Sequence, residues 1–106
     1  MARSKSHKRA QRRAAGKHGY TEVPLPSGRF LDALTSGGGR ATEVERSGKY
    51  NRLLNAADRL REAGTPQKVL VVPHNDIDLA VEAMREVGIT GTVKNITGSK
   101  KKRVRW

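Results

Sequence analysis

The spacing of apolar and polar residues predicts a helix and then three short strands in the first half of the chain. Residues 4–15 are rich in Ala, Arg, Lys and Gln, which favour a helix, and the run ends at Gly16. The segment 21–25 alternates weakly and is broken by Pro24 and Pro26, which confine it to the edge of a sheet. The strand-like runs 29–34 and 40–46 are joined by the turn-rich TSGGG, which predicts a hairpin.

The second half begins with a helical pattern and an apolar strand. Apolar residues recur at helical spacing over 49–63, with Ser47 as the expected N-cap and Gly64 as the stop. The uninterrupted run KVLVV at 68–72 is typical of a strand covered on both faces. We therefore place 68–72 at the centre of the sheet.

A second helix and a last strand complete the pattern. Asn75 and Asp78 form an expected capping pair, and apolar residues then repeat at three and four until Gly88, before a short strand at 89–96. A strand-helix-strand step needs a right-handed crossover, so 68–72 should run parallel to the strand before it. The fold class predicted is α/β, with a mixed sheet of an antiparallel hairpin plus a parallel strand, flanked by helices.

Charge divides the chain into three parts. The 22 Lys and Arg outnumber the 10 Asp and Glu, which gives a net charge of +12. Residues 1–20 carry seven basic residues and 91–106 carry six, both without an acid, whereas 21–90 is nearly neutral. We therefore expect a basic N-terminal arm at 1–20, an α/β core at 21–96 and a basic tail at 97–106.

An excess of this size predicts a polyanionic partner, and nucleic acid is favoured over the alternative of solubilising tails. No apolar run reaches the ~20 residues that cross a bilayer, and the basic segments lack an apolar face for a membrane surface. The absence of Cys excludes disulfides and thiolate metal sites and indicates a soluble, cytoplasmic protein. With four aromatic residues, phosphate contact should dominate over base stacking. The expected phosphate-binding residues are Lys5, Lys8, Arg9, Arg12, Arg13, Lys17, Lys100, Lys101, Lys102, Arg103 and Arg105.

Three acids in the predicted hairpin are candidates for a metal site. Glu43 and Glu45 alternate along one strand and so project from the same face. If Leu34 pairs with Ala41, Asp32 lies opposite Glu43 and points the same way. Such a cluster needs a cation, and Mg²⁺ (or Mn²⁺) prefers carboxylate oxygens and would activate water beside a phosphate. The spacing alone fits equally well with solvated acids paired to neighbouring arginines.

The order of the predicted elements is similar to that of a known protein family. A basic helix, a hairpin with LDAL and TEVERS on its strands, a helix, the KVLVVP strand and a further helix resemble the PD-(D/E)XK nuclease superfamily over roughly residues 4–96. In size the chain looks most like its Holliday-junction-resolvase-like and small phage, mobile-element or toxin-type members. The resemblance implies a restriction-endonuclease-like fold and a metal-dependent endonuclease. It makes Asp32 and Glu43 metal ligands, joined by Glu45.

Position 45 departs from the family pattern, which places Lys there. Lys49 is the preferred substitute over Lys68, so the expected catalytic residues are Asp32, Glu43, Glu45 and Lys49. The function predicted is hydrolysis of phosphodiester bonds, with DNA favoured over RNA and a homodimer left open. The alternatives are a non-catalytic nucleic-acid-binding protein that grips phosphates with its basic termini, and a toxin-like nuclease domain separated from a larger secreted protein.

Overall fold

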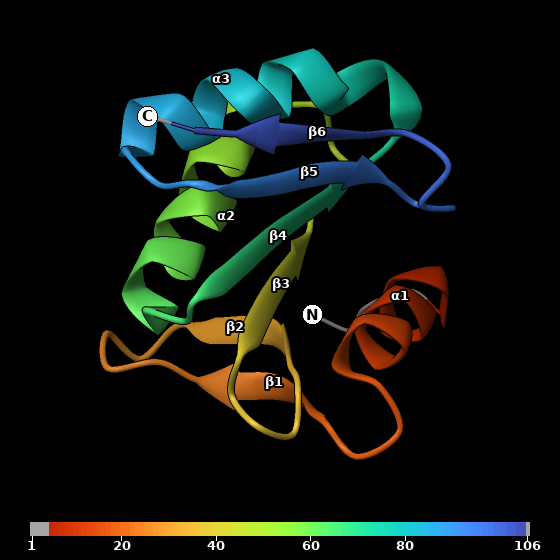
Figure 1. Cartoon of the computed structure of the whole chain (residues 1–106), viewed down its shortest axis with the longest axis vertical. Coiled ribbons are helices and arrows are strands. Elements are labelled where there is room, and N and C mark those ends of the chain that lie inside the picture. The colour runs from red at the N-terminus through yellow and green to blue at the C-terminus, as the bar shows by residue number, and fades with distance from the viewer. Residues whose placement is uncertain (1–4, 106) are drawn as a thin grey trace.

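The structure is a computed structural model, and it describes residues 5–105. A mixed six-stranded sheet is flanked by α-helices, which confirms the predicted α/β class (Figure 1). No helix within 5–105 has the length and apolar character needed to span a membrane. The elements in chain order are α1 (Lys5–Ala15), β1 (Tyr20–Pro24), β2 (Phe30–Leu34), β3 (Arg40–Val44), α2 (Tyr50–Ala63), β4 (Gln67–Val72), the short 3-10 helix η1 (His74–Asp76), α3 (Ile77–Val87), β5 (Gly91–Asn95) and β6 (Lys101–Val104).

The strands lie in the sheet in the order in which they occur in the chain. Strands β1, β2 and β3 pair antiparallel, β3, β4 and β5 pair parallel, and β6 returns antiparallel to β5. The hairpin pairs Leu34 with Ala41, which is the register on which the predicted acidic cluster depends. Strand β4 lies between β3 and β5 and parallel to β3, so its predicted central place is confirmed.

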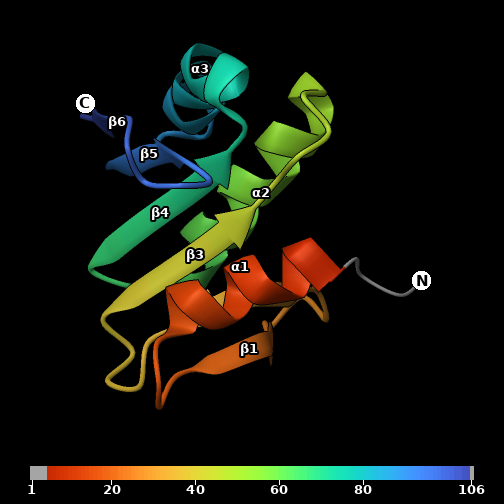
Figure 2. The ribbon, with the colours of Figure 1, turned by 90° about the vertical axis from the view of Figure 1, so that its right-hand side faces the viewer.

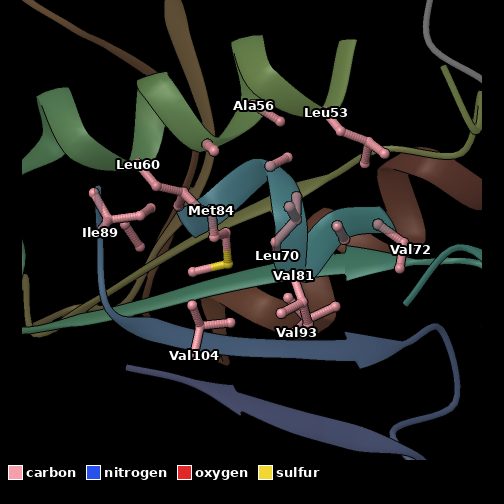
Figure 3. Packing of buried hydrophobic residues seen from close by; sticks show 14 of the residues in the cluster. Leu53, Ala56, Leu60, Leu70, Val72, Val81, Met84, Ile89, Val93 and Val104 are labelled. Carbon is pink, nitrogen blue, oxygen red and sulfur yellow. The ribbon is translucent and has the colours of Figure 1, made fainter. Parts of the chain in front are cut away.

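One face of the sheet is covered by α2 and α3 and holds the main core. Leu53 and Leu60 from α2 and Met84 from α3 pack against Leu70 and Val93 of the sheet (Figure 3). All five side chains are fully buried. Because alternate residues of a strand point to opposite faces, the same strands present different residues to the other side.

The opposite face is covered by α1 over only part of its width. Helix α1 lies beside β3 and leaves β5 and β6 uncovered on this side (Figures 1 and 2). A small apolar cluster of Val44, Val69 and Val71 lies on this face, with Ala10 of α1 and Ile96 packed against it. The sheet therefore has one closed face and one half-open face.

The structure corrects three local predictions. The expected basic tail contains β6, because Val104 is buried in the main core and brings 101–104 into the sheet. Ser47 is not the N-cap of α2, which is Lys49 without a side-chain cap. The Asn75–Asp78 capping pair is wrong as well, because η1 precedes α3 and Asp76 takes the N-cap position without a side-chain bond. Ser4 and Trp106 lie outside the described residues.

Candidate nucleic-acid interface and acidic pair

The half-open face of the sheet carries two adjoining grooves that share Arg40 and Lys94 in their linings. The first runs along α1, and the second extends over the ends of β3 to β6. Together they form one surface, which we call the basic trough. Its cationic lining residues are Arg9, Arg13, Arg40, Arg46, Lys68, Lys94, Lys101 and Arg103.

The register of the strands explains why these cations gather on one face. Lys94 of β5 is the Cα partner of Lys101 of β6, and Thr92 is the partner of Arg103. Partners in a ladder point to the same face, so both pairs project together. Arg40 lines both grooves from β3 on the same side. Of the intervening residues, Val93 of β5 points into the core and its partner Lys102 of β6 pairs with Asp78 of α3. The other four residues of the two pairs therefore lie on the open side.

The trough concentrates positive charge without acidic neighbours. No acidic residue lines either groove, and in the described part of the chain none forms an ion pair with its eight cations. Burial, followed by repulsion from Arg40, Lys101 and Arg13, lowers the pKa of Lys94. Such a surface attracts a polyanion strongly, because binding relieves repulsion among its own charges.

The basic residues predicted to contact phosphates differ in their places in the structure. Arg9, Arg13, Lys101 and Arg103 line the basic trough. The Arg12 guanidinium donates to the carbonyl oxygens of Gly16 and Gly19, and Lys102 pairs with Asp78 at 2.6 Å. Lys5, Lys8, Lys17, Lys100 and Arg105 are exposed and do not line the trough.

Four trough residues were missed as phosphate contacts because they lie in the nearly neutral core or in a strand: Arg40, Arg46, Lys68 and Lys94. Arg40 and Arg46 sit among acids in the sequence, so their charge is hidden in a regional count. Lys94 could have been found from the alternation of β5, in which Val93 faces the core and its neighbours face outwards. The net charge of a segment cannot show which side of a sheet a residue faces.

The predicted acidic residues Asp32 and Glu43 lie at the point where the ladder between β2 and β3 ends. The Asp32 backbone N–H donates to Glu43 Oε2 at 2.7 Å, and the Val44 N–H donates to Asp32 Oδ2 at 2.8 Å. The two carboxylates thus accept backbone donors where the ladder stops, which keeps buried N–H groups paired. We call Asp32 and Glu43 the acidic pair.

Side chains from two helices reach the acidic pair. Asp32 Oδ1 accepts Gln11 Nε2 at 2.7 Å and lies 3.1 Å from His7 Nε2, both from α1. Glu43 Oε1 accepts Arg59 Nε of α2 at 2.6 Å. The two acids are therefore neighbours on adjacent strands but are held from opposite sides of the sheet. The expectation that Asp32 and Glu43 point to the same face is wrong, because the Asp32 side chain is held by α1 and that of Glu43 by α2. Sequence patterns gave no indication of His7, Gln11 or Arg59 as partners.

Burial changes the protonation of Glu43. Its side chain is 1 % exposed, and that of Asp32 is similarly enclosed. Burial and then the negative charge of Asp32 raise the pKa of Glu43 from 4.5 to about 8. The Arg59 guanidinium and the Asp32 N–H act in the opposite direction but less strongly. Glu43 is therefore a buried carboxyl that binds its proton tightly in the fold.

The remaining predicted site residues lie apart from this pair. The Glu45 carboxylate accepts the Ser47 N–H at 2.9 Å, and Lys49 is exposed at the start of α2. The other lysine considered, Lys68, donates to the Thr65 carbonyl oxygen at 2.7 Å. Within residues 5–105, no three His, Asp or Glu side chains come close enough together to hold a metal ion.

Carboxylate oxygens suit Mg²⁺, but each oxygen of the acidic pair already accepts an N–H group. Both side chains are also closed to solvent, whereas Mg²⁺ usually keeps several waters. As arranged, the acidic pair does not fit a resident Mg²⁺ unless some of these hydrogen bonds open.

Comparison with known proteins adds no family to these observations. No family model, no curated protein and no solved structure matches the chain. Inference about function therefore depends on the trough and the acidic pair themselves.

Proposed function

We propose that this protein binds nucleic acid through its phosphate backbone, along the basic trough. The observation that carries the proposal is the convergence of eight cations from α1, four strands and the loop after β3 on one concave surface with no acid in its lining. Arg40 and Arg46 are six residues apart in the sequence, which corresponds to about 20 Å of extended chain. At 3.4 Å per nucleotide this length accommodates about six phosphates of one strand.

The shape and chemistry of the trough favour nucleic acid over other polyanions. A membrane surface would require exposed apolar side chains near the cations, but the large exposed apolar residues Tyr20 and Phe30 lie on β1 and β2. No aromatic residue among 5–105 lines the trough, so binding relies on phosphates and not on stacked bases. Ser6, Thr42 and Thr92 add hydroxyl groups that phosphate oxygens accept from.

The test is a titration of labelled duplex DNA followed by fluorescence anisotropy, at salt concentrations from about 50 to about 200 mM. Six phosphate contacts predict that affinity falls about a thousandfold over this range. The variants Arg40→Gln and Lys94→Gln should each reduce the slope of log affinity against log salt by about 0.9. The same titrations with RNA measure the preference that we expect for DNA.

The matched control is Arg85→Gln, which removes one positive charge from the exposed surface of α3, on the other side of the sheet. This variant should keep the salt slope of the unmodified protein. Equal weakening by Arg85→Gln and Lys94→Gln would mean that only net charge matters, and the trough would then not be the binding site.

A second proposal is phosphodiester hydrolysis that involves the acidic pair and Glu45. It is favoured by the contact between Asp32 and Glu43, which are far apart in the sequence and meet where β2 and β3 separate. The order of elements, in which a helix is followed by three strands, a helix and a strand, also agrees with the expectation from the nuclease resemblance. Hydrolysis would require the buried carboxylates to exchange present hydrogen bonds for contacts with a metal or substrate.

The test of hydrolysis is incubation with linear and branched DNA in Mg²⁺ or Mn²⁺, and then with excess chelator. Glu43→Gln and Glu45→Gln should abolish metal-dependent cleavage while DNA binding persists. Cleavage that continues in chelator, or in both variants, contradicts a metal-dependent reaction at these residues. Binding without cleavage under any of these conditions leaves the first proposal alone.

A further inference from the structure

Helix α1 has an unusually small apolar contact with the sheet for an element that forms one wall of the trough. Its buried residues are His7, Gln11 and Ala15, and Ala10 adds a half-buried methyl group. Burying a single methyl group contributes little to stability, so the alanines hold the helix weakly. The two polar residues of this stripe both reach Asp32.

Asp32 is therefore the main polar attachment of α1 to the sheet. It is 2 % exposed, and its Oδ1 is within hydrogen-bond distance of Gln11 and His7. Its other oxygen accepts the Val44 N–H of β3, so one carboxylate joins the helix to the strand next to the trough. Hydrogen bonds to a buried charged group are stronger than those between neutral groups.

The opposite flank of the same helix faces the trough. Arg9 and Arg13 line it, one helical turn apart, together with Ser6. Residues at positions 7 and 11 cannot leave the sheet without moving 9 and 13, because all belong to one rigid helix. The position of two trough cations thus depends on a buried acid that does not itself line the trough.

We propose that Asp32 is a positioning residue for nucleic-acid binding: it holds α1 so that Arg9 and Arg13 form one wall of the basic trough. This inference rests on the proposed binding function. It predicts an effect opposite in sign to simple electrostatics. Removing an acid from a strongly cationic protein should tighten binding to a polyanion, whereas loss of this anchor weakens it.

The test compares Asp32→Asn with the double variant Arg9→Gln/Arg13→Gln, using duplex DNA and a salt series. Asparagine has one acceptor oxygen, so it cannot serve both the α1 side chains and the Val44 N–H. For both Asp32→Asn and Arg9→Gln/Arg13→Gln, the slope of log affinity against log salt should be smaller in magnitude by about two than for the unmodified protein. Combining all three substitutions should weaken binding no further, because both changes remove the same contacts.

Hydrogen exchange supplies a readout that does not require nucleic acid. In Asp32→Asn the amides of α1 should lose protection while those of β4 and α2 keep it. The matched control is Glu22→Gln, which makes the same change of charge at an exposed residue of β1 and should bind as tightly or more tightly. If Asp32→Asn fails to fold, the double variant His7→Ala/Gln11→Ala removes the helix side of the contact and decides the question.

The proposal is overturned if Asp32→Asn, or His7→Ala/Gln11→Ala, binds as tightly as Glu22→Gln and keeps α1 protected. If the unmodified protein binds no nucleic acid, the proposed function fails, and hydrogen exchange alone shows whether Asp32 anchors the helix. Unfolding of the whole sheet in both variants would mean that Asp32 is a general core residue, which also contradicts a positioning role.

Discussion

The protonation of Glu43 makes a quantitative prediction about stability against pH. The fold raises the pKa of this carboxyl from 4.5 to about 8, so the folded state binds the proton more tightly than the unfolded chain. The resulting stabilisation is fully present below pH 4.5 and is lost as the pH rises through about 8. At 1.36 kcal/mol per pKa unit, the difference amounts to about 5 kcal/mol at most.

The perturbation is Glu43→Gln, which resembles the protonated carboxyl in shape and cannot ionise. Its free energy of unfolding, measured by urea denaturation from about pH 5 to about pH 9, should stay higher than that of the unmodified protein at the alkaline end. The difference between the two proteins should grow as the pH rises to about 8 and then level off. Other titrating groups are common to both and cancel in that difference. The measured value will be below the upper limit, since Arg59 and water relax around the ionised group.

A difference that stays constant with pH would refute the reasoning. It would mean that Glu43 is ionised throughout, and that Arg59 at 2.6 Å compensates for burial and for Asp32. A difference of the opposite sign, with Glu43→Gln less stable at high pH, would show that the ion pair with Arg59 is worth more than the cost of burying both charges.

Three further predictions concern stability. Leu70→Ala, at a fully buried site in the central strand, should lower the free energy of unfolding by about 3–5 kcal/mol in urea, and Leu70→Met by less than about 1.5 kcal/mol. Glu22 has a φ of 52° in β1, so Glu22→Gly should raise the thermal midpoint, by relief of about 1 kcal/mol of backbone strain. Lys94→Met should raise stability at neutral pH while weakening DNA binding, because its pKa is lowered by burial and by neighbouring cations; equal or lower stability contradicts this.

The sequence predicted most of the sheet because its signals are local. The apolar run of β4 predicts a central strand, and the turn between β2 and β3 predicts a hairpin, both without reference to the rest of the chain. Strand β6 was missed because one buried residue, Val104, is all that distinguishes it from a solvated basic tail. A single apolar residue gives no periodic pattern, and only pairing with β5 makes the segment a strand.

The candidate site was predicted in part for the same reason. Alternation along β3 correctly places Glu43 on the face opposite Thr42 and Val44, and the hairpin brings Asp32 close to it. The partners of the acids come from α1 and α2, and no rule of spacing connects Gln11 or Arg59 with a strand. Whether the acids and Glu45 act together in hydrolysis stays a prediction.

The two faces of the sheet differ in what they contribute: one holds the stabilising apolar core, and the other holds the cluster of cations. The closed face buries the apolar side chains of α2 and α3, and acids bordering it pair with arginines, as Asp58 and Glu62 do with Arg29 at 2.8 and 2.9 Å. The half-open face gathers cations that repel one another and so reduces stability. A fold under selection for stability alone would place an acid among them, and all ten acids of the chain lie elsewhere. The missing counter-charge is what a phosphate backbone would supply, and bound DNA should therefore stabilise the protein by removing this repulsion.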